Sequence, residues 1–130
     1  MALLTKALRQ ALLANGAHRD GLDRDPVPVA KFFNPCGAAT LATELDADGD
    51  TLFGLADLGF GCPELGSFSL AELAGVRLPF GLRIERDLHF STTHRLSAWA
   101  EAARRAGSIM AGEKLLRRTP TTGLSDPSGD

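Results

Sequence analysis

The strongest constraint on the fold of this chain is a pair of strand-like segments joined by an acidic turn. Residues 40–46 and 51–57 have the composition of short strands, and the sequence Asp-Ala-Asp-Gly-Asp occupies 46–50 between them. Asp hydrogen-bonds its own backbone in turns and Gly accepts a positive φ, so this pentapeptide favours a reversal of the chain. The pattern predicts a β-hairpin and therefore an antiparallel pair of strands.

The same acidic turn also invites comparison with an EF-hand calcium loop. Such a loop needs Gly at its sixth position and a bidentate Glu at its twelfth. Counted from Asp46, Gly49 stands at the fourth position and Asp57 at the twelfth. The mismatch favours the turn over a calcium site.

Helical patterns lie on both sides of the hairpin. Leu and Ala recur at helical spacing over 3–12, which predicts an amphipathic N-terminal helix. Ser69 and Glu72 have the spacing of a capping box and predict a short helix after them. Ser97 is placed to cap a C-terminal helix over 98–106.

Further strand patterns occupy residues 29–33, 66–68 and 82–90. In the last of these, apolar and charged side chains alternate, as on a strand with one solvated face. Strands in a run with helices at both ends predict an α+β fold. We expect an antiparallel sheet of about four strands, with helices on one face: an N-terminal helix, a short inserted helix and a C-terminal helix.

The length of 130 residues fits one domain, which we place at 1–118. Residues 119–130 are small, polar and proline-bearing, and they predict a disordered tail. Lys6 and Arg9 interrupt the N-terminal apolar run, which argues against a signal peptide, and no membrane-spanning run is present. We therefore expect a cytoplasmic protein with reduced thiols at Cys36 and Cys62.

Five short segments resemble a known family when they are taken together. They are KFFNP at 31–35, TELD at 43–46, LFGL at 52–55, ELGSFSLAEL at 64–73 and IERDLHF at 84–90. The region of about 22–96 that contains them is similar to the uncharacterised bacterial family called domain of unknown function 2958. That resemblance implies a plasmid or another mobile genetic element as the setting, and it implies no activity.

Carboxylates in these segments are candidates for a metal site. Glu85 and Asp87 project from one face of a predicted strand, and Glu44 would face them if the hairpin neighbours that strand. Three such carboxylates suit Mg²⁺ or Mn²⁺, which could activate water for phosphodiester cleavage with Lys31 as a helper. The alternative is that they form ion pairs with Lys31 and nearby arginines.

Two other binding sites are conceivable from the residue types present. Cys36, Cys62, His89 and His94 are the zinc-ligand types, but the cysteines are too far apart in sequence for a typical zinc motif. Basic side chains near the C-terminus could contact phosphates, and phenylalanines on the sheet could stack on bases. The basic residues are Arg104, Arg105, Lys114, Arg117 and Arg118, and the phenylalanines are Phe32, Phe33 and Phe53. Core packing of the phenylalanines is the simpler interpretation.

No motif for covalent catalysis or nucleotide binding is present. There is no Gly-x-Ser-x-Gly elbow, and Gly59-Phe-Gly61 is not followed by the rest of a phosphate loop. The sequence therefore favours a small accessory interaction protein of a mobile element, which binds a protein or nucleic-acid partner without catalysis or cofactor and can form a homo-oligomer. The alternative is a hydrolase, such as a nuclease, that binds Mg²⁺ or Mn²⁺ through Glu44, Glu85 and Asp87.

Overall fold

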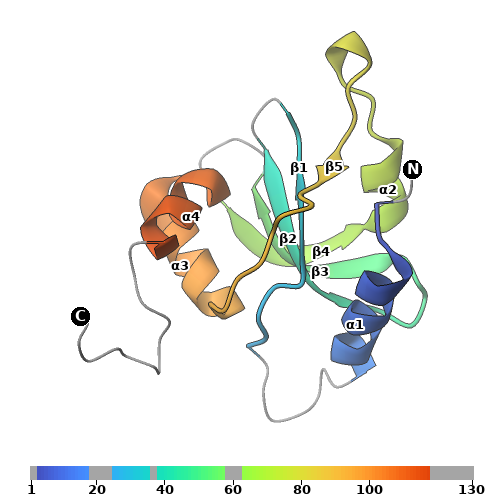
Figure 1. The fold of residues 1–130 in the computed structure, drawn as a ribbon, viewed down its shortest axis with the longest axis horizontal. Coiled ribbons are helices and arrows are strands. Elements are labelled where there is room, and N and C mark those ends of the chain that lie inside the picture. The colour runs from blue at the N-terminus through green and yellow to red at the C-terminus, as the bar shows by residue number, and fades with distance from the viewer. Residues whose placement is uncertain (1–2, 18–24, 36–37, 58–62, 118–130) are drawn as a thin grey trace.

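The computed structural model of the protein describes residues 3–17, 25–35, 38–57 and 63–117. Its centre is a five-stranded antiparallel sheet with the strand order β4-β3-β2-β1-β5 (Figure 1). The strands are β1 (Ala30–Phe33), β2 (Ala39–Leu45), β3 (Thr51–Asp57), β4 (Glu64–Ser69) and β5 (Glu85–Arg86). The helices are α1 (Lys6–Ala17), α2 (Leu70–Gly75), the 3-10 turn η1 (Pro79–Gly81), α3 (Leu96–Ala106) and α4 (Ile109–Arg117). The predicted α+β class is confirmed, with one strand more than expected.

The predicted hairpin forms between β2 and β3. Leu45 pairs with Leu52, and the backbone N–H of Asp46 donates to the carbonyl oxygen of Thr51 at 2.8 Å. Gly49 has a φ of 76°, the left-handed conformation that the turn requires. The local signal in the sequence was therefore sufficient to place this hairpin.

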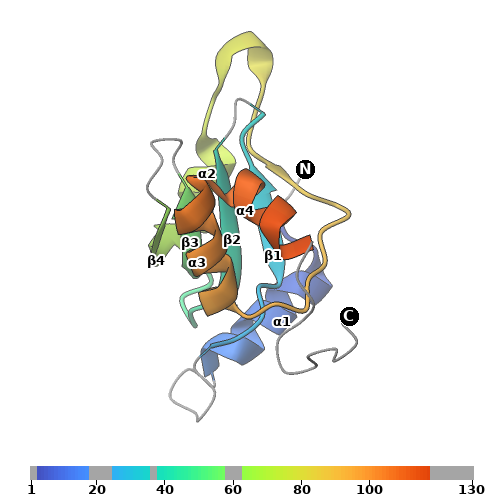
Figure 2. The ribbon, with the colours of Figure 1, turned by 90° about the vertical axis from the view of Figure 1, so that its left-hand side faces the viewer.

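Helices cover both faces of the sheet, so the prediction that they lie on one face was wrong (Figures 1 and 2). Leu41 and Leu55 belong to a core shared with α3 and α4, whereas Leu45 and Leu52 belong to a second core shared with α1. Every residue of β2 is buried, as expected for a strand between two layers. Leu41 and Leu45 are four residues apart and would share a face in a regular strand, but the register shift between Ala42 and Glu44 turns Leu45 to the opposite face.

One helix end agrees with its prediction and one differs. α3 ends at Ala106, as predicted, because Gly107 takes the left-handed conformation at a φ of 89°, and α4 follows it as an additional helix. Ser97 does not cap α3, which begins at Leu96. Its N–H and Oγ instead donate to the carboxylate of Asp25, at 2.8 Å and 2.5 Å. The prediction for Ser69 is confirmed, since its Oγ accepts from the N–H of Glu72 at 3.1 Å.

The predicted strand over 82–90 is reduced to the two residues of β5. Arg86 pairs with Phe32 and Glu85 pairs with Phe33, at the end of the short strand β1. Beyond them the chain turns, and the N–H of Phe90 donates to the carbonyl oxygen of Asp87. Residues 82–84 run past Phe33, the last residue of β1, and strand structure needs a partner. After Arg86 the turn at Asp87–Phe90 takes the chain away from β1, although β1 continues to Ala30.

No helix in the described part of the chain has the length and apolar character needed to cross a membrane. The predicted tail at 119–130 lies outside the described residues, as do Cys36 and Cys62.

Candidate functional site

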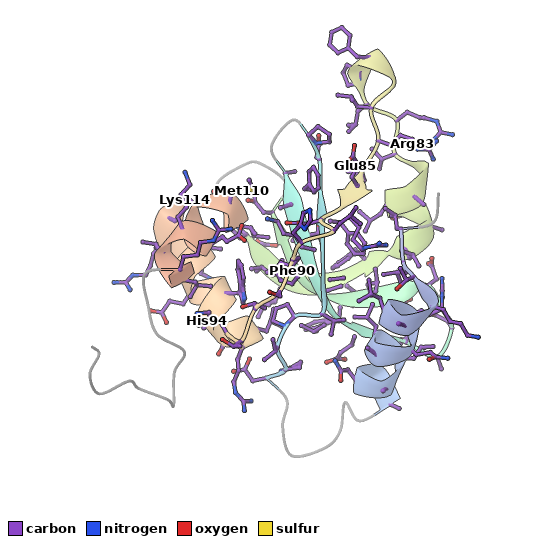
Figure 3. The ribbon with its side chains drawn as sticks, in the orientation of Figure 1. Arg83, Glu85, Phe90, His94, Met110 and Lys114 are labelled. Carbon is purple, nitrogen blue, oxygen red and sulfur yellow. The ribbon has the colours of Figure 1, made fainter. Side chains whose placement is uncertain are left out.

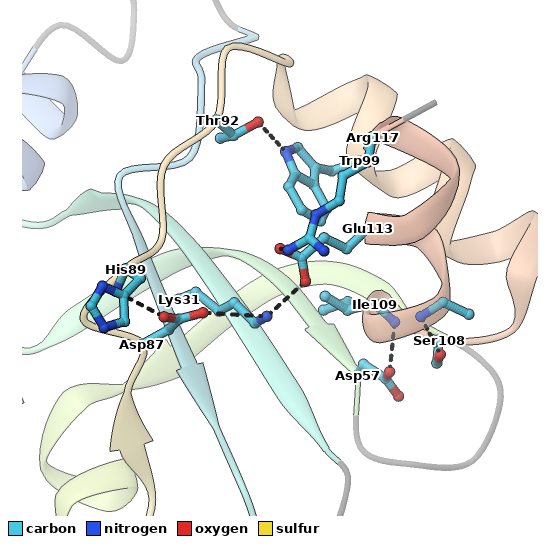
Figure 4. A network of polar contacts seen from close by, with 11 residues as sticks. Lys31, Asp57, Asp87, His89, Thr92, Trp99, Ser108, Ile109, Glu113 and Arg117 are labelled. Atoms are coloured by element: carbon cyan, nitrogen blue, oxygen red, sulfur yellow. Dashed lines mark hydrogen bonds and ion pairs between the residues drawn. The ribbon is translucent and has the colours of Figure 1, made fainter. Parts of the chain in front are cut away.

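Lys31 lies on β1, and its side chain is buried between the sheet and α4. Its Nζ lies 2.9 Å from Oε1 of Glu113 and 3.6 Å from Oδ2 of Asp87 (Figure 4). The Lys31 side chain is 5% exposed, compared with 27% for Asp87 and 18% for Glu113. A buried ammonium group needs such partners because its desolvation is costly. Lys31 therefore ties α4 and the segment after β5 to the sheet.

The two carboxylates around Lys31 are also held from their other sides. Oδ1 of Asp87 accepts the N–H of His89 at 2.9 Å, and Oε2 of Glu113 accepts from Nη2 of Arg117 at 3.2 Å. The positive and negative groups thus alternate through the cluster. Because each charged group already has a partner of opposite charge, the cluster is better suited to stabilising the fold than to acting as a general acid or base.

An open pocket of about 690 Å³ lies beside this cluster. Its walls include the charged side chains of Asp87, Glu113 and Arg117, together with the indole of Trp99. The Trp99 Nε1–H donates to Oγ1 of Thr92 at 3.1 Å, which fixes the segment that forms the far wall (Figure 4). Any ligand there would have to compete for groups that already have partners.

The structure brings Lys31 and Asp87 together but does not gather the three candidate metal ligands. Glu85 pairs with Phe33, which pairs with Ala39 at the start of β2. Glu44 lies near the other end of β2, roughly 15 Å away at ~3.3 Å per residue. Within the described ranges, no group of three or more His, Asp or Glu side chains is arranged to hold a metal ion.

The zinc-ligand types are only partly described. His89 and His94 both border the pocket beside Trp99. Cys36 and Cys62 fall outside the described residues, so the zinc site stays a prediction from the sequence.

The carboxylates of the hairpin turn accept hydrogen bonds from the turn itself and from the beginning of α2, the helix that follows β4. Oδ1 of Asp48 accepts the N–H groups of Asp50 and Thr51, and Oδ2 accepts the Thr51 hydroxyl at 2.6 Å. The Thr51 hydroxyl, followed by the two backbone N–H groups, lowers the pKa of Asp48 from 3.8 to about 2. Both oxygens of Asp50 accept hydrogen bonds, from the Ser69 hydroxyl and from the N–H of Ala71. These contacts are those of a turn, in agreement with the sequence interpretation.

Carboxylates from distant parts of the chain also bind the N-termini of α3 and α4. Asp25 accepts from Ser97, which is 72 residues away, and Oδ2 of Asp57 accepts from the N–H of Ile109, which is 52 residues away. Free N–H groups at a helix N-terminus favour such negative partners. Asp25 and Asp57 therefore stabilise the fold by binding helix N-termini.

A projecting arm was missed by sequence reasoning. Residues 76–84, here called the arm, leave the body after α2, turn at η1 and return at β5, and they extend beyond the rest of the molecule in both views (Figures 1 and 2). The N–H of Leu78 donates to the carbonyl oxygen of Leu82 at 3.0 Å, which closes the tip. At the tip, Phe80 is 98% exposed and has a φ of 64°. The sequence Pro79-Phe-Gly81 was the available signal for a turn.

Comparison with known proteins places the chain in a family without an assigned function. No curated protein and no solved structure matches it. The model of the family described as "Protein of unknown function (DUF2958)" matches residues 3–110. That range includes the sheet, α1–α3, the arm and the cluster around Lys31 except for its α4 partners. The chain belongs to the DUF2958 family.

Proposed function

We propose that this chain is a non-catalytic binding protein and that its arm is the surface that contacts a protein partner. The family resemblance supports the further proposal that it is an accessory protein of a bacterial plasmid or other mobile element and acts in the cytoplasm. The single observation that carries the binding proposal is that Phe80 is 98% exposed and has a left-handed backbone conformation.

Phe80 combines full exposure with an unfavourable backbone conformation. The left-handed region costs a residue with a side chain roughly 1–2 kcal/mol, and bulky residues rarely occupy it. The ring is 98% exposed, so contacts within the fold do not offset that cost. An apolar ring held out at the tip of an arm is typical of an anchor that a partner buries.

The charges and aromatic rings favour a protein partner over a nucleic acid. Phe32 is buried, and Phe33 and Phe53 pack against the core under α3 and α4, so these rings do not form an open stacking surface. The arm carries two exposed basic side chains, Arg77 and Arg83, and the exposed acidic Glu85 follows directly in β5. Charges of both signs beside an exposed apolar ring suit a protein surface better than a phosphate backbone.

The metal-dependent hydrolase is the weaker proposal on this geometry. It requires Glu44, Glu85 and Asp87 to meet around one ion, and the separation of Glu44 from Glu85 along the sheet does not favour that. A thermal-shift titration with Mg²⁺ and Mn²⁺ tests it directly. A rise in Tm for the wild type that Glu85→Gln abolishes would favour the hydrolase over the binding protein.

The binding proposal is tested by capture with matched variants. Tagged wild type, Phe80→Asn and Met110→Asn are each incubated with lysate of cells that carry the gene, and bound proteins are quantified by mass spectrometry. Met110 is 48% exposed on α4 and lies away from Arg83 and Glu85 (Figure 3), so it controls for loss of any exposed apolar side chain. We expect proteins that bind wild type and Met110→Asn but not Phe80→Asn. Equal capture by all three would contradict the role of the arm.

A further inference from the structure

The strand β4 forms an edge of the sheet on the side away from the arm. It stands at one end of the strand order, and β5, which follows the arm, stands at the other end. In Figure 2, β4 is the left-hand margin of the sheet, and β3 is its only strand neighbour in the described part of the chain. Its six residues pair with β3 without a register shift. A regular edge strand can pair with a further strand through its outward backbone groups.

The pairing with β3 shows which backbone groups of β4 point outward. The N–H of Leu70, just after β4, donates to the carbonyl oxygen of Asp50 at 2.9 Å, so it points toward β3. Inward and outward groups alternate along an antiparallel strand. The N–H and C=O groups of Leu65 and Ser67 therefore point away from the sheet. Natural edges are often protected by Lys, Pro or a bulge, and β4, with the sequence ELGSFS and a regular register, carries none of the three.

The residues at the two ends of this edge are complementary to each other. Pro63, two positions before Leu65, has no N–H to donate. Ser69, two positions after Ser67, is the N-cap of α2, and the carbonyl oxygen of an N-cap already accepts the first bond of its helix. Antiparallel pairing of two copies about a two-fold axis at Gly66 places Pro63 of one copy opposite Ser69 of the other. The residue without a donor then faces the carbonyl group that needs none.

The axis at Gly66 is also the register that best satisfies the outward groups of Leu65 and Ser67. These two residues then face each other on both sides of the axis, and each pair exchanges both of its N–H···O bonds. An axis at Leu65 places Ser67 opposite Pro63, which leaves the Ser67 carbonyl oxygen without a donor. An axis at Ser67 places Leu65 opposite Ser69, whose carbonyl oxygen already accepts a bond from α2.

The exposed apolar side chain of β4 is covered in the same register. Leu65 pairs with Leu55 on the sheet face that packs under α3 and α4, yet its side chain is 44% exposed. With the axis at Gly66, the two Leu65 side chains are diagonal neighbours on one face of the joined sheets. Long side chains reach each other across such a diagonal. Each copy therefore buries apolar surface that the other copy leaves exposed.

We propose that two copies of this chain associate through β4, antiparallel about a two-fold axis at Gly66, so that their sheets join into one continuous sheet. The match of Pro63 with Ser69 and the mutual cover of Leu65 favour a second copy over an unrelated extended segment. This inference goes beyond the proposed function and does not depend on it. Because the arm follows the opposite side of the sheet, the dimer keeps both arms available to protein partners.

Sedimentation velocity of the full chain tests the contact. Two six-residue strands bury less than the ~1,600 Å² of a standard interface, so we expect a Kd of roughly micromolar size, and the concentrations span it. Leu65→Lys brings two ammonium groups together near the axis, and Lys is a residue that protects natural edges. Met110→Lys is the matched control, since Met110 on α4 is 48% exposed and Leu65 is 44% exposed. We expect Leu65→Lys to weaken dimerisation about tenfold or more and Met110→Lys to leave it unchanged, with thermal unfolding to check that both variants fold.

Cysteine crosslinking tests the register. With the axis at Gly66, the two copies of this residue form a non-hydrogen-bonded pair with Cα atoms about 4.5 Å apart, which a disulfide can span. A Cβ at Gly66 meets nothing within 4 Å in its own chain, so Gly66→Cys fits the fold. Leu65→Cys and Ser67→Cys place their thiols on diagonals of about 7–8 Å. We expect oxidation to link Gly66→Cys fastest, with wild type as the background for Cys36 and Cys62 and peptide mass spectrometry to identify the linked positions.

Three results would overturn the inference. A monomer at every concentration would exclude the second copy and leave this edge to a strand of another protein. A dimer as strong for Leu65→Lys as for Met110→Lys would show that another surface is used. Faster linking of Leu65→Cys or Ser67→Cys than of Gly66→Cys would move the axis away from Gly66. Capture that depends on Phe80 is unaffected by all three results, so the failure of this inference can be distinguished from the failure of the proposed function.

Discussion

The side chain of Lys31, on the second strand from the edge of the sheet, is joined to Glu113 on the last helix by a contact of 2.9 Å between Nζ and Oε1. The two residues are 82 positions apart in the chain. Their contact fastens α4 to the face of the sheet, and Asp87 joins the same ammonium group from the segment after β5.

Removal of the charge at Lys31 is expected to destabilise the fold. Lys31→Met removes the ammonium group that the partly buried carboxylates of Glu113 and Asp87 share, and it leaves Glu113 with only the exposed Arg117 as its cation. We expect a loss of about 2–3 kcal/mol in the free energy of unfolding. Lys114→Met, on the exposed side of α4, should change it by less than about 0.5 kcal/mol. Urea denaturation measures both.

A double-mutant cycle checks that Glu113 carries part of this effect. The double variant Lys31→Met/Glu113→Gln should lose less free energy of unfolding than the two single variants lose in sum. The reason is that Glu113→Gln removes the carboxylate charge that Lys31→Met leaves without its buried partner. Strict additivity would mean that the two side chains do not stabilise each other.

Two paired glycines are expected to respond oppositely to the same substitution. Gly54 and Gly66 face each other across β3 and β4. A Cβ at Gly54 would lie 1.8 Å from the carbonyl oxygen of Leu41, beside the bulge in β2, whereas at Gly66 it would meet nothing within 4 Å. We expect Gly54→Ala to cost about 3 kcal/mol or more and Gly66→Ala to be neutral or slightly stabilising. Thermal unfolding of the two variants decides this, and equal Tm values would contradict the close approach of β2 to Gly54.

The cap that Asp57 provides to α4 should be measurable as stability. Asp57 is 1% exposed, and its Oδ2 accepts the N–H of Ile109 at 2.8 Å. Asp57→Ala leaves this buried N–H without that acceptor, and we expect a loss of about 2 kcal/mol. Asp57→Asn keeps an acceptor oxygen and should cost less. Glu101→Ala, at an exposed position on α3, serves as the control, and a cost for Asp57→Ala no greater than for Glu101→Ala would rule out the cap.

Asp48 should make the stability of the hairpin depend on pH in the acid range. The pKa of its carboxyl group is lowered from 3.8 to about 2 in the fold, so the folded state favours the charged form. The stabilisation is therefore complete above a pH of 3.8 and is lost as the pH falls through about 2. The difference in Tm between wild type and Asp48→Asn should shrink over that interval.

An NMR titration of the Asp48 carboxyl group gives an independent reading of the same effect. A midpoint near that of an ordinary aspartate, or a Tm difference that does not change down to the lowest pH, would contradict the hydrogen bonds from Thr51 and Asp50.

Local features of the sequence were enough to predict the hairpin, the capping of α2 by Ser69 and the presence of helices near both ends. Each depends on residues within about four positions of one another, such as Ser69 with Glu72 or Asp46 with Gly49. The backbone preferences and short-range hydrogen bonds that produce them act before any distant contact forms.

Only the tertiary structure decided which layer each helix joins, which carboxylate serves which helix and where the arm stands. Nothing near Lys31 in the sequence indicates Glu113 as its partner, and nothing near Asp57 indicates Ile109. Glu44, Glu85 and Asp87, the ligands of the alternative metal-site hypothesis, are not gathered because β1 lies between β2, which carries Glu44, and the sheet edge that carries the other two. Such relationships depend on how the whole chain packs to bury its apolar surface, and the alternation of apolar and polar residues in one segment does not specify what that segment will meet.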